Sequence, residues 1–427
     1  MLATLKHSKV TLRPDPARTV IRPFAPGDPA GFENAKDPRG KRIVARVRAL
    51  EPADAQRRLA AVLDDLATRH RDVETMLMRR FEEVRETAVG TDTLSRECAL
   101  LIGAYFCEEY SFEAAALFNP SMVLHPDQSG LPERTVRVAM SLRGIGEGHV
   151  SSVTFRTGTW ALDGEIAIDP LSSHAVAPQI EPVDGEEGSF WLICDDSRQL
   201  SETVLFPVAP SQKQGIEDVR LVNFTEEDGS IVHLGTYTAF SGSTTRSELL
   251  QAASFNKFLM RPMRGVIEKS KGTALFPRRV NGRYMMLGRQ DNENIWLLSS
   301  DSLTDWQDAA KLVTPRYPWE FVQMGNCGSP IEIDEGWLVM THGVGMVRNY
   351  CIGACLLDKA DPSKVLARTP EPLLQPGPEE RDGYVPNVVY SCGGIVHDRT
   401  LLLPYGVADG FTAFASMPVD ELLGLMR

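Results

Sequence analysis

The strongest constraint on the fold is a long carboxy-terminal stretch of short strand-like segments. After Phe118 the helical spacing of apolar residues disappears, and alternating or β-branched runs such as RTVRVAMSLRG, SFWLIC, IVHLGTYTAF and GWLVMTHGV take its place. Turn signals at hairpin spacing, including Asp228-Gly229 and Asn281-Gly282, separate these runs. The pattern predicts an all-β body that covers residues 117–427.

Within this body, clusters of strand segments recur at intervals of roughly 60 residues. A β-sandwich of this length would be unusual, whereas four-stranded blades arranged around an axis accommodate it without long exposed edges. We therefore predict a five-bladed β-propeller. Propellers carry their binding groups on the loops around a central channel, so polar residues at strand ends are the candidates for function.

The amino-terminal part has a different texture. Residues 1–51 are rich in Pro and Arg and weakly periodic, which predicts an extended arm that packs on the propeller. Residues 52–116 form a predicted helical insertion: apolar residues recur at three- and four-residue steps over 52–87, as one helix or two in line, and again over 94–116. These runs predict an antiparallel pair with no core of its own, which caps the main domain or pairs with another subunit.

The apolar stripes of this insertion also bear on assembly. Leu59–Leu66 and Val73–Val84 would stay partly exposed to water in an isolated helical pair. We therefore expect a homo-oligomer, a dimer or larger. The alternative is that both stripes pack on the propeller of the same chain.

Composition excludes several classes of partner. The 427 residues include 45 basic and 57 acidic side chains, a net charge of −12, which argues against nucleic acid. No run approaches the roughly 20 apolar residues that a membrane helix needs, and the amino-terminal segment lacks the apolar core of a secretory signal. We expect a cytoplasmic protein without membrane contact. Its seven cysteines contain no CxxC pair, so neither a disulfide framework nor a zinc site is predicted.

One strand segment carries unusual charge. In Gly215-Ile216-Glu217-Asp218-Val219-Arg220-Leu221, alternation sends Asp218 and Arg220 to one face and Glu217 to the other, so a single carboxylate points into a given cavity. Asp218 could act as a catalytic acid, although Arg220 would oppose that role by lowering the pKa of Asp218. A plain Asp–Arg pair is the alternative.

Two further segments could bind an anion. One hairpin concentrates cations that could hold a phosphate or an acidic sugar, or could simply form a solvated face: Lys269, Lys271, Arg278, Arg279 and Arg289. His342 ends the apolar strand WLVM beside glycines, where it could contact a ligand or fill a structural role. No HxH, HExxH, GxSxG or GxxxxGK[ST] pattern occurs, so we expect neither a metal nor a cofactor.

Taken in order, several motifs resemble those of glycoside hydrolase family 130, the inverting β-mannoside phosphorylases and related β-mannosidases. The motifs that carry the resemblance are RPF (22–24), FNPS (118–121), EDVR (217–220), the Tyr237 strand, LFPRRVNGRYMML (275–287), GWLVMTHGV (336–344), Tyr350 followed by GACLLD, and PYGVADG (404–410). The family fold is a five-bladed β-propeller, which agrees with the strand pattern.

The resemblance implies roles for individual residues. Asp218 matches the catalytic acid, which acts on the glycosidic oxygen through a hydroxyl of the mannosyl residue in the −1 subsite, while inorganic phosphate attacks the anomeric carbon from the opposite face. The product is α-mannose 1-phosphate, with phosphate as co-substrate and no metal. The implied substrate-binding residues are Asn119, Ser121, Arg220, Tyr237 and Asp409. The implied phosphate-binding residues are Lys271, Arg289, His342 and Tyr350.

The chain also departs from the family pattern. Val219 replaces the usual proline of the EDPR motif, Gly288-Arg289-Gln290 replaces an HRP-like ending, and residues 143–152 replace a segment where further ligand-binding arginines would be expected. Our leading hypothesis is a phosphorylase of β-1,2- or β-1,4-mannosides. The alternatives are a β-mannosidase with Glu147 or Glu217 as base, a mannosyl-transferring relative, and a non-catalytic glycan-binding propeller.

Overall fold

Antiparallel strands dominate the larger of the two units into which the chain divides. The computed structural model describes residues 5–90, 93–162, 165–268, 270–381 and 383–427. The strand unit comprises Met1–Pro16, Phe112–Leu171 and Pro178–Arg427, and the helical unit comprises Ala17–Ser111 and Ser172–Ala177. None of the helices in the described ranges is both long enough and apolar enough to cross a membrane.

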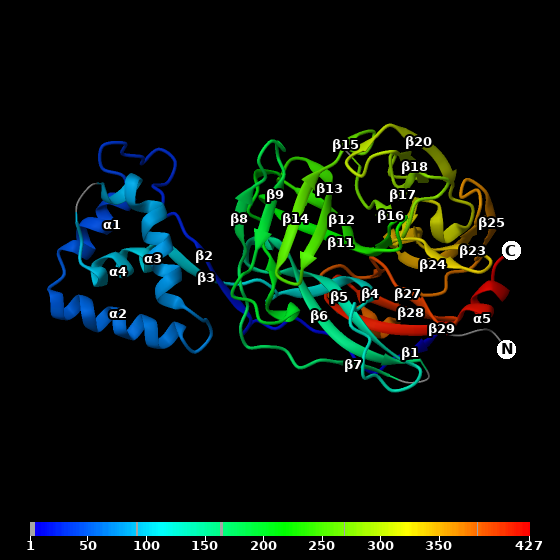
Figure 1. Ribbon diagram of the computed structural model, residues 1–427, viewed down its shortest axis with the longest axis horizontal. Coiled ribbons are helices and arrows are strands. Elements are labelled where there is room, and N and C mark those ends of the chain that lie inside the picture. Colours follow the sequence, from blue (N-terminus) through cyan, green and yellow to red (C-terminus); the bar gives the residue numbers. More distant parts are fainter. Residues whose placement is uncertain (1–4, 91–92, 163–164, 269, 382) are drawn as a thin grey trace. The chain divides into compact units, whose positions relative to one another are not determined.

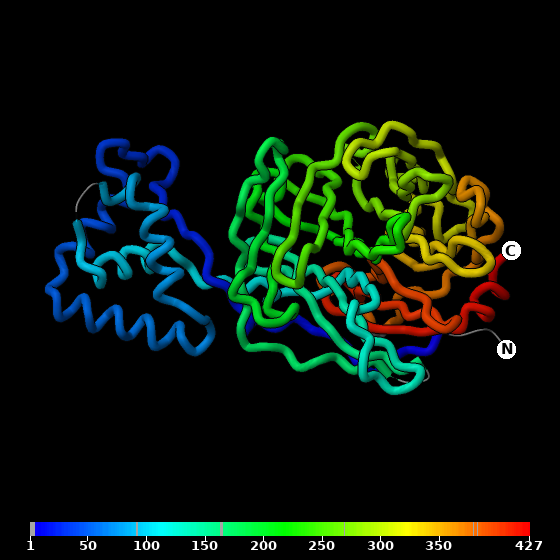
Figure 2. Tube along the Cα trace, viewed as in Figure 1, coloured from blue at the N-terminus to red at the C-terminus, as the bar shows by residue number. Residues whose placement is uncertain are grey.

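The described strands of the strand unit fall mainly into five groups, and nearly all members of each group are consecutive in the chain (Figure 1). The first group is β4 (Ala116–Leu124), β5 (Thr135–Ile145), β6 (Ser151–Ala161) and β7 (Ile166–Ile168), with β10 (Val204–Leu205) added to β6. The second group is β8 (Gln179–Pro182), β9 (Phe190–Ile193), β11 (Gly215–Thr225), β12 (Ile231–Phe240), β13 (Thr245–Ser254) and β14 (Lys257–Pro262). The Cα trace runs back and forth through β11 to β14 (Figure 2).

The remaining groups complete the strand unit. The third is β16 (Ala274–Leu275), β17 (Tyr284–Gly288), β18 (Ile295–Ser300) and β20 (Asp308–Val313). The fourth is β21 (Gln323–Asn326), β22 (Ile331–Ile333), β23 (Gly336–Val344), β24 (Tyr350–Leu357) and β25 (Val365–Arg368). The fifth is β26 (Val389–Tyr390), β27 (Ile395–His397), β28 (Thr400–Val407) and β29 (Phe411–Pro418), followed by helix α5 (Val419–Gly424). The short strands β15 (Arg264–Gly265) and β19 (Asp305–Trp306) pair with each other.

Both ends of the strand unit meet in the fifth group. The amino-terminal strand β1 (Lys6–His7) pairs with β29, with Lys6 opposite Ser416. The first and second groups are joined in one sheet by the parallel pair Gly215 and Ser151. The expected all-β body is therefore present, and part of the expected arm is a strand that joins the last group.

Buried apolar residues pack between consecutive groups. Phe155 of the first group packs with Tyr237 and Leu250 of the second. Further shared cores join the second group to the third, the third to the fourth, and the fourth to the fifth. Trp160 of the first group meets Phe414 of the fifth at a ring-centroid distance of 5.8 Å. Each group thus packs against the next, and the last packs against the first.

The helical unit contains α1 (Arg39–Arg48), α2 (Pro52–Leu66), α3 (Val73–Val84), α4 (Arg96–Tyr105) and the ribbon of β2 (Thr19–Pro23) with β3 (Cys107–Ser111). Its helices share a core in which Leu77 and Ile102 are fully buried. The expectation that the helices have no core of their own is therefore wrong. The amphipathic faces of all four helices turn toward this common core.

The element boundaries also differ from those expected. Helix α1 lies in the segment predicted to be an extended arm, and the second helical run ends at Tyr105 because residues 107–111 pair with β2. A turn at residues 67–72 separates α2 from α3, with Asp72 in the left-handed region at φ 49°. The two units consequently have bounds other than the divisions 1–51, 52–116 and 117–427.

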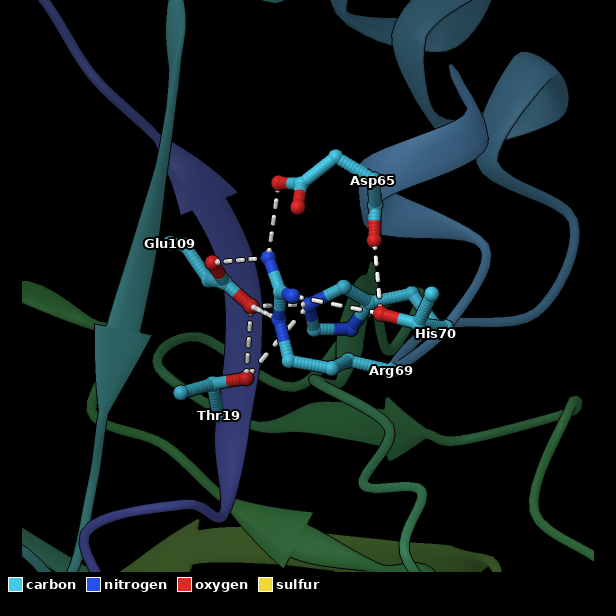
Figure 3. Close-up of polar contacts among 6 residues, drawn as sticks. Thr19, Asp65, Arg69, His70 and Glu109 are labelled. Carbon is cyan, nitrogen blue, oxygen red and sulfur yellow. Dashed lines mark hydrogen bonds and ion pairs between the residues drawn. The ribbon is translucent and has the colours of Figure 1, made fainter. Parts of the chain in front are cut away.

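Glu109 on β3 ties the ribbon of the helical unit to the turn after α2 (Figure 3). Its carboxylate accepts hydrogen bonds from Arg69 Nε (2.7 Å), Arg69 Nη2 (3.0 Å) and Thr19 Oγ1 (2.8 Å), and lies 2.8 Å from His70 Nε2. Arg69, followed by His70 and Thr19, lowers the pKa of Glu109 to about 2, against a smaller effect of burial. Glu109 is thus a charged anchor of this unit.

Candidate functional site

Asp218 lies on a β-bulge of β11. The pairing of β11 with β12 shifts register between Glu217 and Arg220, and Asp218 adopts a left-handed backbone with φ 53°. Such a conformation is costly for a residue other than glycine and is often retained at functional sites. The bulge breaks strand alternation, so Glu217 and Asp218 both reach Arg143. The expectation that they face opposite sides is wrong for this reason.

A second bulge faces the first. In β4 the register shifts between Phe118 and Ser121, and Asn119 has φ 49°. Asn119 Nδ2 donates to Asp218 Oδ1 at 2.8 Å, and Ser121 Oγ accepts from the Leu221 backbone N–H at 2.9 Å. The structure therefore brings Asn119 and Ser121, both singled out in the sequence, to the strand that carries Asp218.

Arg143 on β5 links the two carboxylates. Its Nη2 lies 2.7 Å from Glu217 Oε1, its Nη1 lies 3.4 Å from Asp218 Oδ1, and its Nε donates to Ser151 Oγ at 2.9 Å. Burial alone would raise the pKa of Asp218, but Arg143, the Asn119 amide, Arg220 and Lys271 outweigh burial and hold this pKa below its usual value of 3.8. Arg220 lowers the pKa of Asp218, as the sequence predicts, and Arg143 lowers this pKa more.

Asp409 is a third carboxylate near Arg143. It follows β28 with φ 49° and is partly buried. Burial, together with the negative charge of Asp218, raises the pKa of Asp409 to about 6, although Arg143 and Arg348 oppose the rise. Burial also raises the pKa of Glu217. The three carboxylates around Arg143 therefore differ: the pKa of Asp218 is lowered, whereas those of Asp409 and Glu217 are raised.

Buried cations lie next to this cluster. Arg220 donates from Nη1 to the carbonyl oxygens of Gly272 (2.7 Å) and Asn326 (2.8 Å), and from Nη2 to Tyr390 Oη (2.7 Å). Arg289 approaches the same glycine: a Cβ atom on Gly272, whose φ is +71°, would lie 3.0 Å from Arg289 Nε and 3.2 Å from Arg220 Nη2. A glycine is therefore required where the two guanidinium groups meet.

His342 completes the cationic pocket. Its Nε2 lies 3.4 Å from Arg289 Nη1, and its ring lies 4.8 Å from that of Tyr390 and 6.2 Å from that of Tyr350. Burial, Arg289 and Arg220 hold the pKa of His342 well below 6.5, so the imidazole is neutral at pH 7. Among the described residues, Arg289 Nε is a buried donor without a hydrogen-bond partner. We define Arg220, Arg289, His342 and Tyr390 as the cation pocket, which can offer donors to an anion.

The other predicted site residues do not all join the carboxylate cluster or the cation pocket. Lys271 is exposed, but its charge lowers the pKa of both Glu217 and Asp218. Tyr237 lies in a buried network of its own, where its hydroxyl donates to Glu248 at 2.5 Å and accepts from Gln212 at 2.8 Å. Glu147 is exposed on the turn between β5 and β6.

The cations of the predicted anion-binding hairpin do not gather at one site. Arg278 forms an ion pair with Glu332 at 2.7 Å, and Arg279 stacks on the Tyr284 ring, so neither joins Arg289. Lys269 lies outside the described residues.

Sequence reasoning missed Arg143 and Tyr390. Arg143 begins the segment that departs from the family pattern, residues 143–152, so the resemblance assigns it no role. Its partners lie 74 and 75 residues away in sequence. Tyr390 stands in a short apolar strand that carries no polar signal, and only the fold brings its hydroxyl to Arg220.

Comparison with known proteins identifies relatives of the carboxy-terminal half of the chain. A family model described as β-1,4-mannooligosaccharide phosphorylase matches residues 197–427. A 1,2-β-oligomannan phosphorylase from Thermoanaerobacter sp. is 34% identical over 228 residues, which cover 52% of this chain and 75% of the relative. A β-1,2-mannobiose phosphorylase from Listeria innocua is 34% identical over 230 residues, covering 51% and 62%.

Solved structures extend the similarity to the fold. The structure of the Listeria innocua β-1,2-mannobiose phosphorylase in complex with β-1,2-mannobiose matches with a TM-score of 0.54 and 22% identity, covering 73% of this chain and 92% of the other. The family model alone spans more than half of the chain. On this evidence the chain belongs to glycoside hydrolase family 130.

Proposed function

We propose that this protein is an inverting phosphorylase of β-1,2- or β-1,4-linked mannosides, which releases α-mannose 1-phosphate with Asp218 as general acid. The observation that carries the proposal is the juxtaposition of a carboxylate cluster around Arg143 with the buried cation pocket. A hydrolase needs no anion site, whereas a phosphorylase must bind phosphate next to its acid. The relatives named as mannoside phosphorylases support the same assignment.

The reaction is a single displacement. A phosphate oxygen forms a bond to the anomeric carbon while the bond from that carbon to the glycosidic oxygen breaks on the opposite face, which inverts the configuration. The proton of Asp218 passes through a hydroxyl of the −1 mannosyl residue to the departing oxygen. Asn119 would orient the acid through its 2.8 Å hydrogen bond, and Asp409 would contact the −1 sugar. No metal or cofactor takes part in these steps.

The low pKa of Asp218 in the free protein must rise before it can act as an acid. Arg143 is the largest of the groups that lower it. A phosphate dianion bound near these cations would offset their positive charge, and a sugar over the site would exclude water, so both changes would raise the pKa of Asp218. Binding of both substrates would thus prepare the acid.

The cation pocket suits inorganic phosphate. Arg289 and Arg220 supply charge, neutral His342 and Tyr390 supply further hydrogen-bonding groups, and all four are buried. Charge-assisted hydrogen bonds are strong under such conditions. Lys271 and Tyr350 lie at the border of this pocket in our proposal. Arg220 would thus have two roles: it would bind phosphate, and it would stabilise the strand that carries Asp218.

We also propose that the strand unit is a five-bladed β-propeller. Its five strand groups pack in a cyclic order in which the last group meets the first through Trp160 and Phe414. The amino-terminal β1 completes the fifth group, so one blade would combine both ends of the unit. Asn119, Asp218 and Asp409 come from three different groups, as expected for side chains that meet at a central channel.

The role of Arg143 leads to a prediction about pH. Replacement of Arg143 by Gln removes a cation that lowers the pKa of Asp218, so this pKa should rise. Because activity requires protonated Asp218, the alkaline limb of the kcat/KM profile should move to higher pH, alongside a loss of activity. The Arg137→Gln variant is the matched control, since Arg137 lies on the same strand and pairs with Asp169 at 2.9 Å outside the site. An alkaline limb that stays in place or moves down would contradict this role.

The substrate range is tested by product analysis. β-1,2- and β-1,4-mannobiose and longer β-mannosides are incubated with and without inorganic phosphate, and mannose and mannose 1-phosphate are separated by ion-exchange chromatography. We expect mannose 1-phosphate from at least one linkage only when phosphate is present. Free mannose at equal rates without phosphate would establish a hydrolase instead, and absence of turnover would favour transfer or glycan binding.

A homo-oligomeric state and a cytoplasmic location stay predictions. Much of the two apolar stripes is buried within the helical unit, so they offer less apolar surface to a second subunit than the sequence predicts. What remains is a groove lined by Val62, Leu66 and Ala104, with Tyr105 49% exposed beside it. Light scattering at micromolar concentration should yield a dimer or larger species. A mass of one chain would contradict the prediction.

A further inference from the structure

Two exposed aromatic side chains form a pair beside the carboxylate cluster. The rings of His149 and Tyr384 have centroids 5.1 Å apart and an interplanar angle of 41°. His149 is exposed, and Tyr384 exposes 69% of its surface, so the pair presents aromatic surface to solvent. Exposed aromatic surface at the rim of a polar site is a common mark of ligand binding.

The backbone places Tyr384 next to Asp409. The Val385 N–H donates to the Ala408 carbonyl oxygen at 3.0 Å. Gly383 lies so close to Ala408 that a Cβ atom on this glycine would be 2.4 Å from the Ala408 oxygen. The residues before and after Tyr384 are thus both held against the residue that precedes Asp409.

The turn that carries His149 also adjoins the carboxylate cluster. This turn joins β5, which carries Arg143, to β6, which begins at Ser151, and Arg143 donates to Ser151 at 2.9 Å across it. His149 has φ 58°, a conformation that costs free energy in a residue other than glycine. The turn therefore holds the imidazole against Tyr384 at some cost in stability.

We propose that His149 and Tyr384 form the subsite for the leaving sugar, on the acceptor side of the bond that is cleaved. This inference rests on the proposed phosphorylase function. The side chain of Asp218 is only 22% exposed, whereas the aromatic pair is exposed to solvent, so a mannoside with its terminal residue at the carboxylates extends its next residue toward the pair. Aromatic faces accept the C–H surface of a sugar ring, and the tyrosine hydroxyl and imidazole nitrogens can bind its hydroxyls.

The reverse reaction isolates this subsite, because donor and acceptor are then separate molecules. Synthesis is measured from mannose 1-phosphate with mannose or β-mannobiose as acceptor, for the wild type, Tyr384→Ala and His149→Asn. Asn removes the ring but tolerates a positive φ. We expect the KM of the acceptor to rise about threefold to tenfold, while the KM of mannose 1-phosphate and kcat at saturating acceptor are unchanged.

Two variants serve as controls. Tyr384→Phe retains the ring and should retain most of the acceptor affinity, and Phe32→Ala removes an exposed aromatic ring from the helical unit and should change nothing. An unchanged acceptor KM in both test variants, or an equal rise in the KM of donor and acceptor, would overturn the subsite.

Failure of the proposed function is recognised separately. If the wild type catalyses neither phosphorolysis nor synthesis, the phosphorylase assignment fails, and calorimetric titration of β-mannobiose into the wild type and Tyr384→Ala then tests the pair directly. Weaker binding by Tyr384→Ala would support the sugar site. Equal affinity, or no binding by the wild type, would overturn it.

Discussion

The Asp218→Asn variant is expected to lose phosphorolysis by a factor of about 10²–10⁴. An amide has the size of the carboxyl group but holds no proton that it can donate, so the glycosidic oxygen would depart without protonation. The hydrogen bond from Asn119 Nδ2 would be retained if the amide oxygen occupies the position of Oδ1. Initial rates of mannose 1-phosphate release, with KM determined for both substrates, measure the effect.

Asp228→Asn is the matched control for this substitution. Asp228 is exposed in the turn between β11 and β12, where its carboxylate accepts from the Ser230 backbone N–H at 2.9 Å, and Asn can accept the same bond. This variant should keep full activity. An Asp218→Asn protein with normal kcat would show that Asp218 is not the acid, and attention would turn to Asp409, whose pKa of about 6 is the next most suitable.

The second large effect is expected from Arg289→Gln. This change removes a buried cation from the cation pocket, where Arg289 and Arg220 both lie close to Gly272. A hydrogen bond to a charged group contributes about 1.5–3 kcal/mol, so kcat/KM for phosphate should fall about 10- to 100-fold. The KM of the mannoside should change little, because Arg289 lies on the phosphate side of Asp218 in our proposal.

Arg283→Gln provides the comparison for Arg289. Arg283 lies just before β17 and pairs with Asp308 at 2.8 Å and Asp301 at 3.3 Å on the surface. Both variants lose one cation from the same hairpin, so non-specific effects of charge would appear in both. Arg289→Gln with an unchanged KM for phosphate would mean that the anion binds elsewhere or that water is the nucleophile.

The strand body could be predicted because its signal is local. Alternation and turn residues after Phe118 depend on neighbours in sequence, and most of the expected runs are strands in the structure. The helical unit was harder to predict. Helices show their apolar faces in sequence but not which partner covers them, and α1 lies in a Pro- and Arg-rich region that hides its short apolar face of Val44 and Val47.

The site could be predicted only in part, because bulges decide its geometry. Alternation assigns Glu217 and Asp218 to opposite faces, and only the left-handed conformation of Asp218 brings both to Arg143. The positions of Asn119 and Asp409 depend on the same kind of strained backbone. The role of Arg143 depends on contacts between two strand groups, and no spacing in the sequence indicates these contacts.

The most direct test of the proposed function follows the phosphorus and the sugar in one reaction. The protein is mixed with β-mannobiose and inorganic phosphate, and ³¹P and ¹H NMR spectra are recorded with time. We predict that inorganic phosphate is consumed in step with the appearance of mannose 1-phosphate, whose first-formed anomer is α. Release of free mannose with the phosphate signal unchanged would contradict the account.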